Sequence, residues 1–156
     1  MPHRSRAVVL VALVLSACGE HYREGDERHR SDTVSIGGFL WQEKFSESTI
    51  DGASEILGLE LSLDAYDNGD GAVFLIMDDE QGTHIGETQI IDRCSPIVWS
   101  IDAPVAVAHE IGHALGLEHV DDEDNLMFEL RLGGTDLTDD QIDFMRWATW
   151  YLQHRC

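Results

Sequence analysis

Hydrophobic residues from position 33 onward repeat at two spacings, and these spacings predict strands and helices in turn. Alternation or an unbroken apolar run is typical of strands, whereas intervals of three or four residues are typical of helices. The unbroken run at 72–77 predicts a central strand that is covered on both faces. In all, strands are expected at 34–40, 59–64, 72–77, 83–92 and 97–101, and helices at 41–57, 103–115 and 138–152.

Residues at the expected helix ends fit this assignment. Gly58 suits the end of the first helix because glycine adopts positive φ at low cost. Asp102 is expected to cap the second helix, with Pro104 in its first turn, where a missing N–H costs little. Thr138 followed by Gln141 predicts a capping box at the start of the last helix.

The first 17 residues have the pattern of a secretory signal peptide. Two arginines precede an apolar run at 7–15 that is too short to span a bilayer. The run ends in Leu-Ser-Ala-Cys, which resembles a bacterial lipobox and implies cleavage before Cys18 and lipidation of that cysteine. We therefore expect a lipid-anchored protein of the bacterial cell envelope, at the outer membrane. The alternative is an ordinary signal peptide and a secreted protein.

Residues 18–32 are almost entirely polar and predict a lipidated tether, because such a segment cannot bury enough apolar surface to fold. The expected organisation is a signal peptide at 1–17, the tether at 18–32 and one globular domain at 33–156. With 156 residues, of which 43% are hydrophobic, the chain has room for one core.

The charge of the chain excludes some classes of partner. It has 30 acidic and 10 basic side chains, and its formal net charge is −20. Such a surface is not suited to nucleic acid backbones or to anionic lipids. We therefore expect a monomer that binds no nucleic acid and meets the membrane through its lipid anchor alone.

One loop offers ligands for a second cation. The segment Asp67-Asn68-Gly69-Asp70-Gly71 has carboxylates that suit Ca²⁺. It lacks the spacing of a complete EF-hand loop, and ordinary turn chemistry is the favoured interpretation. Calcium is thus a weakly supported cofactor.

The cysteines predict a cross-link. If Cys18 is lipidated, Cys94 and Cys156 remain as an even pair in an exported protein, which predicts a disulfide. The bond would close a loop of about sixty residues and add roughly 4 kcal/mol of stability through loop entropy. Two free thiols are the alternative.

The segment from His109 to His119 has three imidazoles and a carboxylate at the spacing of a metal site. His109 and His113 are one helical turn apart, so both can bind one ion from the same face. Glu110 lies about 100° further round, where a carboxylate can take a proton from metal-bound water. Gly116 can end the helix at positive φ and return His119 to the same ion. Three protein ligands that leave a fourth position open indicate one catalytic zinc.

This segment, HExxHxxGxxH, and a methionine after it resemble the signature of the metzincin metalloproteases. Met127, in Asn125-Leu126-Met127, matches the methionine turn below the histidines. Residues 137–140, Leu-Thr-Asp-Asp, are similar to the start of the last helix in matrixins. The resemblance covers about 99–152. It implies an α+β fold, an abbreviated metzincin-like domain with a small mixed, twisted sheet, an active-site helix and a C-terminal helix.

Two positions depart from the family patterns. Val120 follows the third histidine, where matrixins usually have serine and adamalysins aspartate. Glu129 stands two residues after Met127, where astacins and serralysins have a tyrosine that serves as a further zinc ligand. The sequence is nearest to the matrixins, and its subfamily stays open.

The residues and the resemblance imply a zinc-dependent endopeptidase that acts on protein or peptide substrates. His109, His113 and His119 are expected to bind zinc, and Glu110 to remove the proton of a zinc-bound water that attacks the scissile carbonyl. The alternative is a non-catalytic, zinc-stabilised binding lipoprotein of the cell envelope. Other ions also suit these ligands, although three imidazoles favour zinc.

Overall fold

The computed structural model describes residues 22–38, 44–63, 71–77, 86–90, 94, 96–129 and 134–156. The expected signal peptide, the expected lipidation at Cys18 and most of the calcium-suited turn at 67–71 lie outside the described residues.

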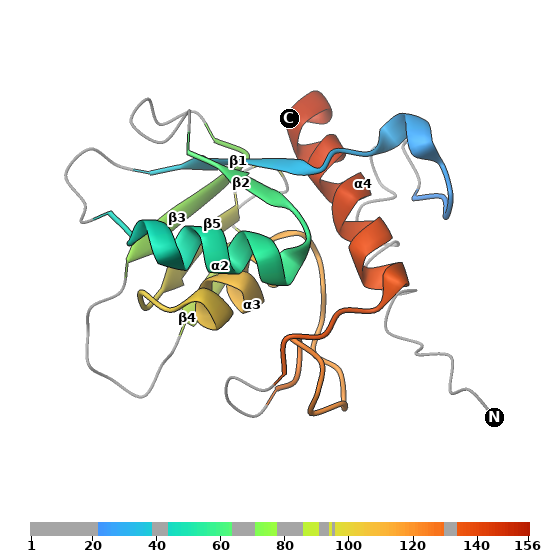
Figure 1. Ribbon diagram of the computed structural model, residues 1–156. Coiled ribbons are helices and arrows are strands. Elements are labelled where there is room, and N and C mark those ends of the chain that lie inside the picture. The colour runs from blue at the N-terminus through green and yellow to red at the C-terminus, as the bar shows by residue number, and fades with distance from the viewer. Residues whose placement is uncertain are drawn as a thin grey trace.

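Within the described residues, five strands form one mixed sheet in the order β2-β1-β3-β5-β4 (Figure 1). All neighbouring pairs are parallel except β4 and β5, which are antiparallel. Since β4 is last in this order, it forms an edge of the sheet as far as the structure describes the chain. The strands are β1 Thr33–Gly37, β2 Glu60–Ser62, β3 Val73–Met77, β4 Gly86–Ile90 and β5 Pro96–Ser100.

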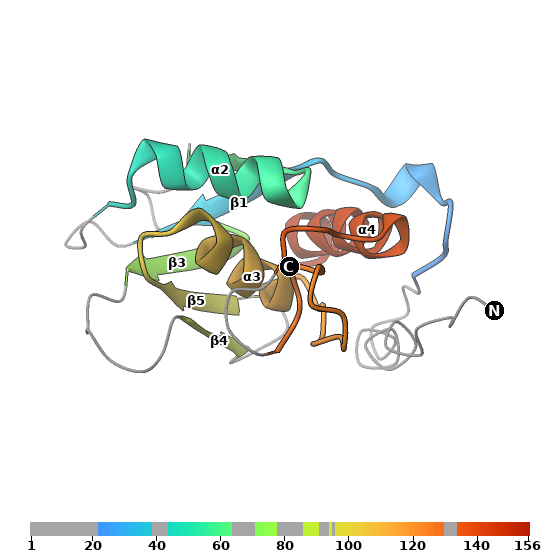
Figure 2. The ribbon, with the colours of Figure 1, turned by 60° about the horizontal axis from the view of Figure 1, so that its bottom comes forward.

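Two helices cover the sheet on one side and a third lies beside it. Figure 2 shows α2 and α3 on the same side of the strands, with α4 next to the end of the sheet. A single hydrophobic core fills the space between these layers. The helices are α2 Glu47–Leu57, α3 Pro104–Ala114 and α4 Asp139–Arg155, and a short 3-10 helix, η2, spans Glu27–His29. This α+β arrangement confirms the expected fold class.

The unbroken apolar run forms the middle strand of the sheet, β3, as expected. Val73 and Leu75 are fully buried against the helices. Phe74 and Ile76, which point to the opposite face, are only half-buried. The expectation of two covered faces was therefore too strong, because the described helices pack on one side only.

Two helix starts differ from the sequence expectation. The first helix begins at Glu47 and not near residue 41, because the Ser46 side chain accepts a hydrogen bond from the amide of Thr49 and caps it there. Asp102 does not cap α3, whose N-cap is Ala103. The carboxylate of Asp102 instead accepts hydrogen bonds from the backbone amide and the hydroxyl of Ser46. Hydrogen bonds from Thr49 and then Ser46 lower the pKa of Asp102. Asp102 thus joins the start of α2 to the chain before α3.

The expected capping box at α4 is confirmed. Thr138 accepts a hydrogen bond from the Gln141 amide at 3.2 Å, and the Gln141 side chain accepts one from the Thr138 amide at 2.9 Å. Behind this cap, α4 buries one aromatic face in the core, which includes Phe144, Trp147 and Tyr151.

The segment from Tyr22 to Asp32 packs on α4, so the prediction of a tether over 18–32 is wrong from Tyr22 onward. Arg30 donates two hydrogen bonds to the carboxylate of Asp143, at 2.8 and 3.0 Å. Tyr22 donates a third at 2.7 Å and places its ring edge-on against Phe144, with centroids 5.2 Å apart. The contacts of Arg30 and Tyr22 therefore hold this segment on α4 in spite of its polar composition.

Removing the Arg30 side chain should destabilise the protein in a pH-dependent way. Burial alone would raise the pKa of Asp143, but hydrogen bonds from Arg30 and Tyr22 outweigh it and hold that pKa below its usual value. Such a carboxylate adds stability above its unfolded pKa of about 4, and this stability is lost as the pH falls through the folded value. Because Asp143 is partly exposed, we expect Arg30→Met to cost only about 1–2 kcal/mol at pH 7.

Urea unfolding of the wild type and Arg30→Met from pH 7 to pH 3 measures this difference, which should shrink below about pH 4. Arg28→Met is the matched control, because Arg28 is bound to Asp26 on the exposed side of the same segment. An equal cost at both ends of the pH range would contradict the assigned role of Asp143.

A disulfide joins Cys94 to Cys156, whose Cα atoms are 5.2 Å apart. It connects the residue at the end of α4 with the segment just before β5. The C-terminal end of α4 is therefore linked covalently to the chain that leads into β5.

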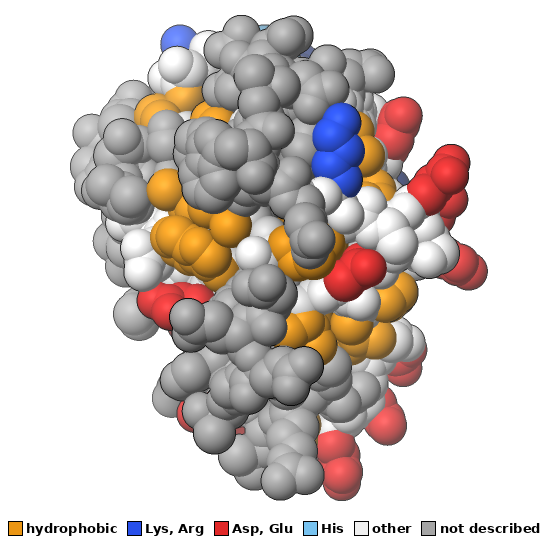
Figure 3. Space-filling model, turned by 90° about the vertical axis from the view of Figure 1, so that its left-hand side faces the viewer, with side chains coloured by type: hydrophobic (Ala, Val, Ile, Leu, Met, Phe, Trp, Pro, Cys, Tyr) orange, Lys and Arg blue, Asp and Glu red, His pale blue; other side chains and the backbone are white. Residues whose placement is uncertain are grey.

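The surface reflects the acidic composition. In the view of Figure 3, acidic side chains lie along the right-hand edge and at the lower left, whereas few basic side chains are visible. Within the described ranges, no helix is both long enough and apolar enough to cross a membrane.

Candidate active site

Helix α3 carries two of the three histidines and ends where the chain can turn back and bring the third to them. His109 and His113 lie one turn apart on it, and its buried face packs into the core. The helix ends at Ala114, and Gly116 has a φ of 91°. The amide of Leu117 then donates to the carbonyl of Gly112 at 2.9 Å, which reverses the chain. The expected role of Gly116 follows from this geometry.

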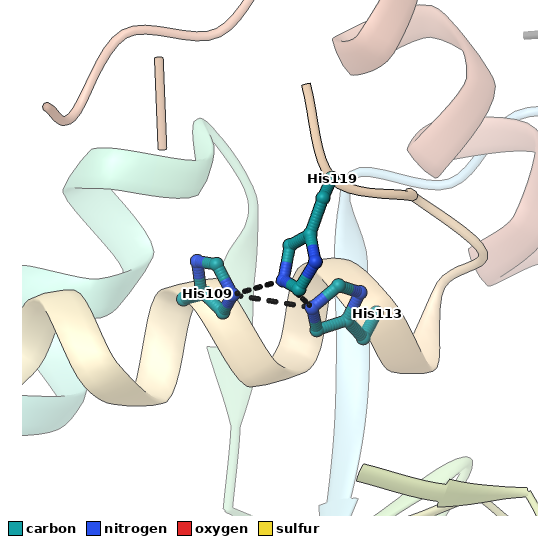
Figure 4. Close-up of side chains that lie close together, drawn as sticks. All are labelled: His109, His113 and His119. Carbon is teal, nitrogen blue, oxygen red and sulfur yellow. Dashed lines mark hydrogen bonds between the residues drawn. The ribbon is translucent and has the colours of Figure 1, made fainter. Parts of the chain in front are cut away.

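The three imidazoles converge (Figure 4). The Nε2 atom of His113 lies 3.1 Å from that of His109 and 3.0 Å from that of His119, and the remaining pair is 3.3 Å apart. Among the described residues these three form the group able to hold a metal ion. Four-coordinate zinc with Zn–N bonds near 2.0–2.1 Å would place its ligand nitrogens about 3.3 Å apart, so the spacing fits zinc.

Backbone carbonyls orient two of the rings. The Nδ1 of His109 lies 2.7 Å from the Leu126 carbonyl, and the Nδ1 of His113 lies 2.8 Å from the Leu117 carbonyl. A carbonyl can only accept, so each Nδ1 carries the proton and each Nε2 directs its lone pair at the other rings. A cation between the rings would be bound by these lone pairs, which is the second reason that the donor set fits a metal.

The ring of His113 stays neutral at ordinary pH. Burial is the main cause that lowers its pKa to about 4, and His109 and His119 add to the effect. The hydrogen bond to the Leu117 carbonyl acts in the opposite direction and is outweighed. A neutral imidazole is the form that binds metal, so no proton has to be displaced from this ligand at neutral pH.

Met127 packs against the helix that carries His109 and His113. It is fully buried, and its sulfur lies so close to α3 that a Cβ on Gly112 would be only 2.7 Å from it. The Asn125 side chain accepts a hydrogen bond from the Met127 amide at 2.9 Å and so shapes the turn. The Asn125 amide group in turn donates to Gln141 at 2.9 Å. The start of α4 therefore holds the methionine turn in place.

Glu110 lies beside the histidines and is almost completely buried, with 7% of its surface exposed. The Thr88 hydroxyl, on the edge strand β4, is 2.7 Å from its carboxylate oxygen Oε2. Burial raises the pKa of Glu110, while the hydrogen bond from Thr88 acts against that rise. The carboxyl group is therefore less acidic than an exposed glutamate and better able to hold a proton.

A comparison with known families identifies the family of the chain. The family model of the matrixins matches residues 23–145. The chain belongs to the matrixin family. The matrixin family is a family of zinc-dependent metallopeptidases.

Other comparisons add little to that result. The crystal structure of metalloproteinase-II from Bacteroides fragilis is 18% identical, with a TM-score of 0.45, and the match covers 78% of this chain and 54% of that one. The matrixin chain thus spans about half the length of that protein. No curated protein matches the sequence.

The structure also assigns residues to the site of this matrixin that the sequence did not indicate. Gly86 and Thr88 contact Glu110 from β4, and the carbonyls of Leu117 and Leu126 orient the ligands. Alternation along 83–92 places residues 86 and 88 on one face, but it does not say which helix residue they meet. That contact depends on the packing of β4 against α3, which is a tertiary feature.

Proposed function

We propose that this matrixin is a zinc-dependent endopeptidase. The observation that carries the proposal is the convergence of three Nε2 atoms within 3.0–3.3 Å, beside a buried glutamate that is not itself one of the ligands. A structural zinc site usually fills all four positions with protein ligands. Among the described residues, three protein ligands meet here, which fits a catalytic site with a position left for water or substrate.

Each residue then has a definite role. His109, His113 and His119 would hold the zinc ion, which supplies positive charge that polarises a peptide carbonyl and lowers the pKa of water. Glu110 accepts the proton of the attacking water and later transfers it to the leaving amine. Its burial favours the first of these steps, since a carboxyl group with a raised pKa takes up a proton more readily. Met127 supports the helix that carries His109 and His113.

The test measures zinc content and peptide cleavage in the same purified sample. We expect one zinc per chain and cleavage of internal bonds in a peptide library, lost with a chelator and restored by added zinc. A chain that carries its zinc and cleaves no peptide would contradict the proposal, and would instead favour a zinc-stabilised binding protein.

We further propose that the domain is anchored at the bacterial cell envelope through a lipid on Cys18. The support is the pattern at 1–18, a short apolar run that ends in Leu-Ser-Ala-Cys. Cell fractionation of the wild type and Cys18→Ser tests this, and a variant that stays in the membrane fraction would contradict it.

A further inference from the structure

Two residues of the edge strand β4 form a seat for Glu110. Gly86 and Thr88 are two positions apart and so face the same side of the strand. Strand β4 is held in register by β5, where Gly86 pairs with Ser100 and Thr88 with Val98. The two residues that contact Glu110 are therefore fixed by the sheet, whereas Glu110 itself is on α3.

The Thr88 hydroxyl reaches two acceptors of one residue. Its Oγ1 lies 2.7 Å from Oε2 of Glu110 and 2.9 Å from the backbone carbonyl oxygen of Glu110. A hydroxyl has one proton to donate and lone pairs with which to accept. Thr88 can therefore donate to the carboxylate, or donate to the carbonyl while it accepts a hydrogen bond from a protonated carboxyl group.

Gly86 fixes the position of the same side chain by its lack of a Cβ. A Cβ on Gly86 would lie 2.5 Å from Cγ and 2.9 Å from Oε1 of Glu110. The two carboxylate oxygens thus differ, since Thr88 binds Oε2 whereas Oε1 lies next to the space that glycine leaves open. Any larger residue at position 86 would push the carboxylate out of its seat.

We propose that Thr88 is a positioning residue that holds the carboxyl group of Glu110 in place during peptide hydrolysis. The inference rests on the proposed function, in which Glu110 takes a proton from water and returns it to the leaving amine. If the proton goes to Oε1, Thr88 keeps donating to Oε2. If it goes to Oε2, Thr88 accepts from that oxygen and turns its own proton to the Glu110 carbonyl. No proton leaves Thr88 in either case.

The test compares kcat, KM and bound zinc for variants at position 88. Thr88→Val and Thr88→Ala both remove the hydroxyl, and each should lower kcat about 10- to 100-fold, the loss expected for a hydrogen bond to a charged group. KM and zinc content should stay near the wild-type values, because the hydrogen bonds of the Thr88 hydroxyl go to Glu110 and not to the histidines. Thr88→Ser keeps the hydroxyl and should restore kcat to within about threefold.

Two further variants complete the experiment. Gly86→Ala should lower kcat with zinc retained, because the methyl group displaces a side chain and not the backbone. Thr33→Val is the matched control, since it removes the same group on β1, where the hydroxyl binds Glu60 on the surface. We expect it to leave kcat unchanged.

The outcomes separate this inference from the proposed function. If Glu110→Gln is inactive and Thr88→Ala keeps the kcat of the wild type, the positioning role is wrong and the endopeptidase proposal stands. If Glu110→Gln is as active as the wild type, the proposed function itself fails. A Thr88→Ser variant as slow as Thr88→Ala would also overturn the inference, because it would show that the methyl group matters and the hydroxyl does not.

Discussion

Glu110→Gln is expected to lower kcat/KM for peptide cleavage by about 10²–10⁴-fold, the usual contribution of general acid–base catalysis. Glutamine has nearly the same shape as glutamate and can still accept a hydrogen bond from Thr88, but it cannot take up a proton. Because Glu110 is not among the three residues grouped as metal ligands, bound zinc should stay at the wild-type level. The measurement is steady-state cleavage of one peptide, with metal analysis of the same samples.

Glu118→Gln is the matched control for this substitution. It changes another glutamate to glutamine next to the ligand His119, at an exposed position. We expect it to keep close to full activity. If Glu110→Gln cleaves the peptide as fast as the Glu118 variant, the assignment of Glu110 as the base is wrong.

The second large effect should come from removing the disulfide. The double substitution of Cys94 and Cys156 by serine is expected to reduce the free energy of unfolding by about 4 kcal/mol. The bond closes a loop with a sequence separation of 62 residues, and loop entropy gives that figure for the constraint on the unfolded chain. Since small domains have net stabilities of about 5–15 kcal/mol, this is a large share of the total.

Chemical denaturation of both proteins, with equal zinc in each sample, measures the loss. The single variant Cys94→Ser should be destabilised like the double variant, because either change breaks the bond. Ellman titration of the denatured wild type without reductant should detect no thiol from either cysteine. A difference in stability below about 1 kcal/mol would contradict the entropy argument.

The sequence predicted those parts of the fold that depend on local rules. The spacing of His109, Glu110 and His113 is a property of one helix, and the capping box at Thr138 is a property of four residues. The left-handed φ of 64° at Gly58 follows a similar rule, since glycine ends helices in that conformation. The structure places all of these features where their local patterns indicated.

Features that depend on contacts between distant segments were not predictable in this way. Asp102 looked like a helix cap, and its carboxylate instead binds Ser46, which lies 56 positions away. Arg30 looked like part of a solvated tether. Composition does not reveal that it binds Asp143 on α4, which lies 113 positions away in the sequence. Thr88 carried no signal of its own, since only the packing of β4 on α3 brings it to Glu110.

The side chain of Gln141 links the stability of two regions. Its Oε1 accepts hydrogen bonds from the Thr138 amide and from Asn125, which itself holds the Met127 amide. A fluctuation that frays the first turn of α4 therefore also releases the turn that supports the metal ligands. The ligand geometry therefore persists only while this helix end stays closed. The pre-organisation of the metal centre thus depends on α4, a helix that contributes no ligand to it.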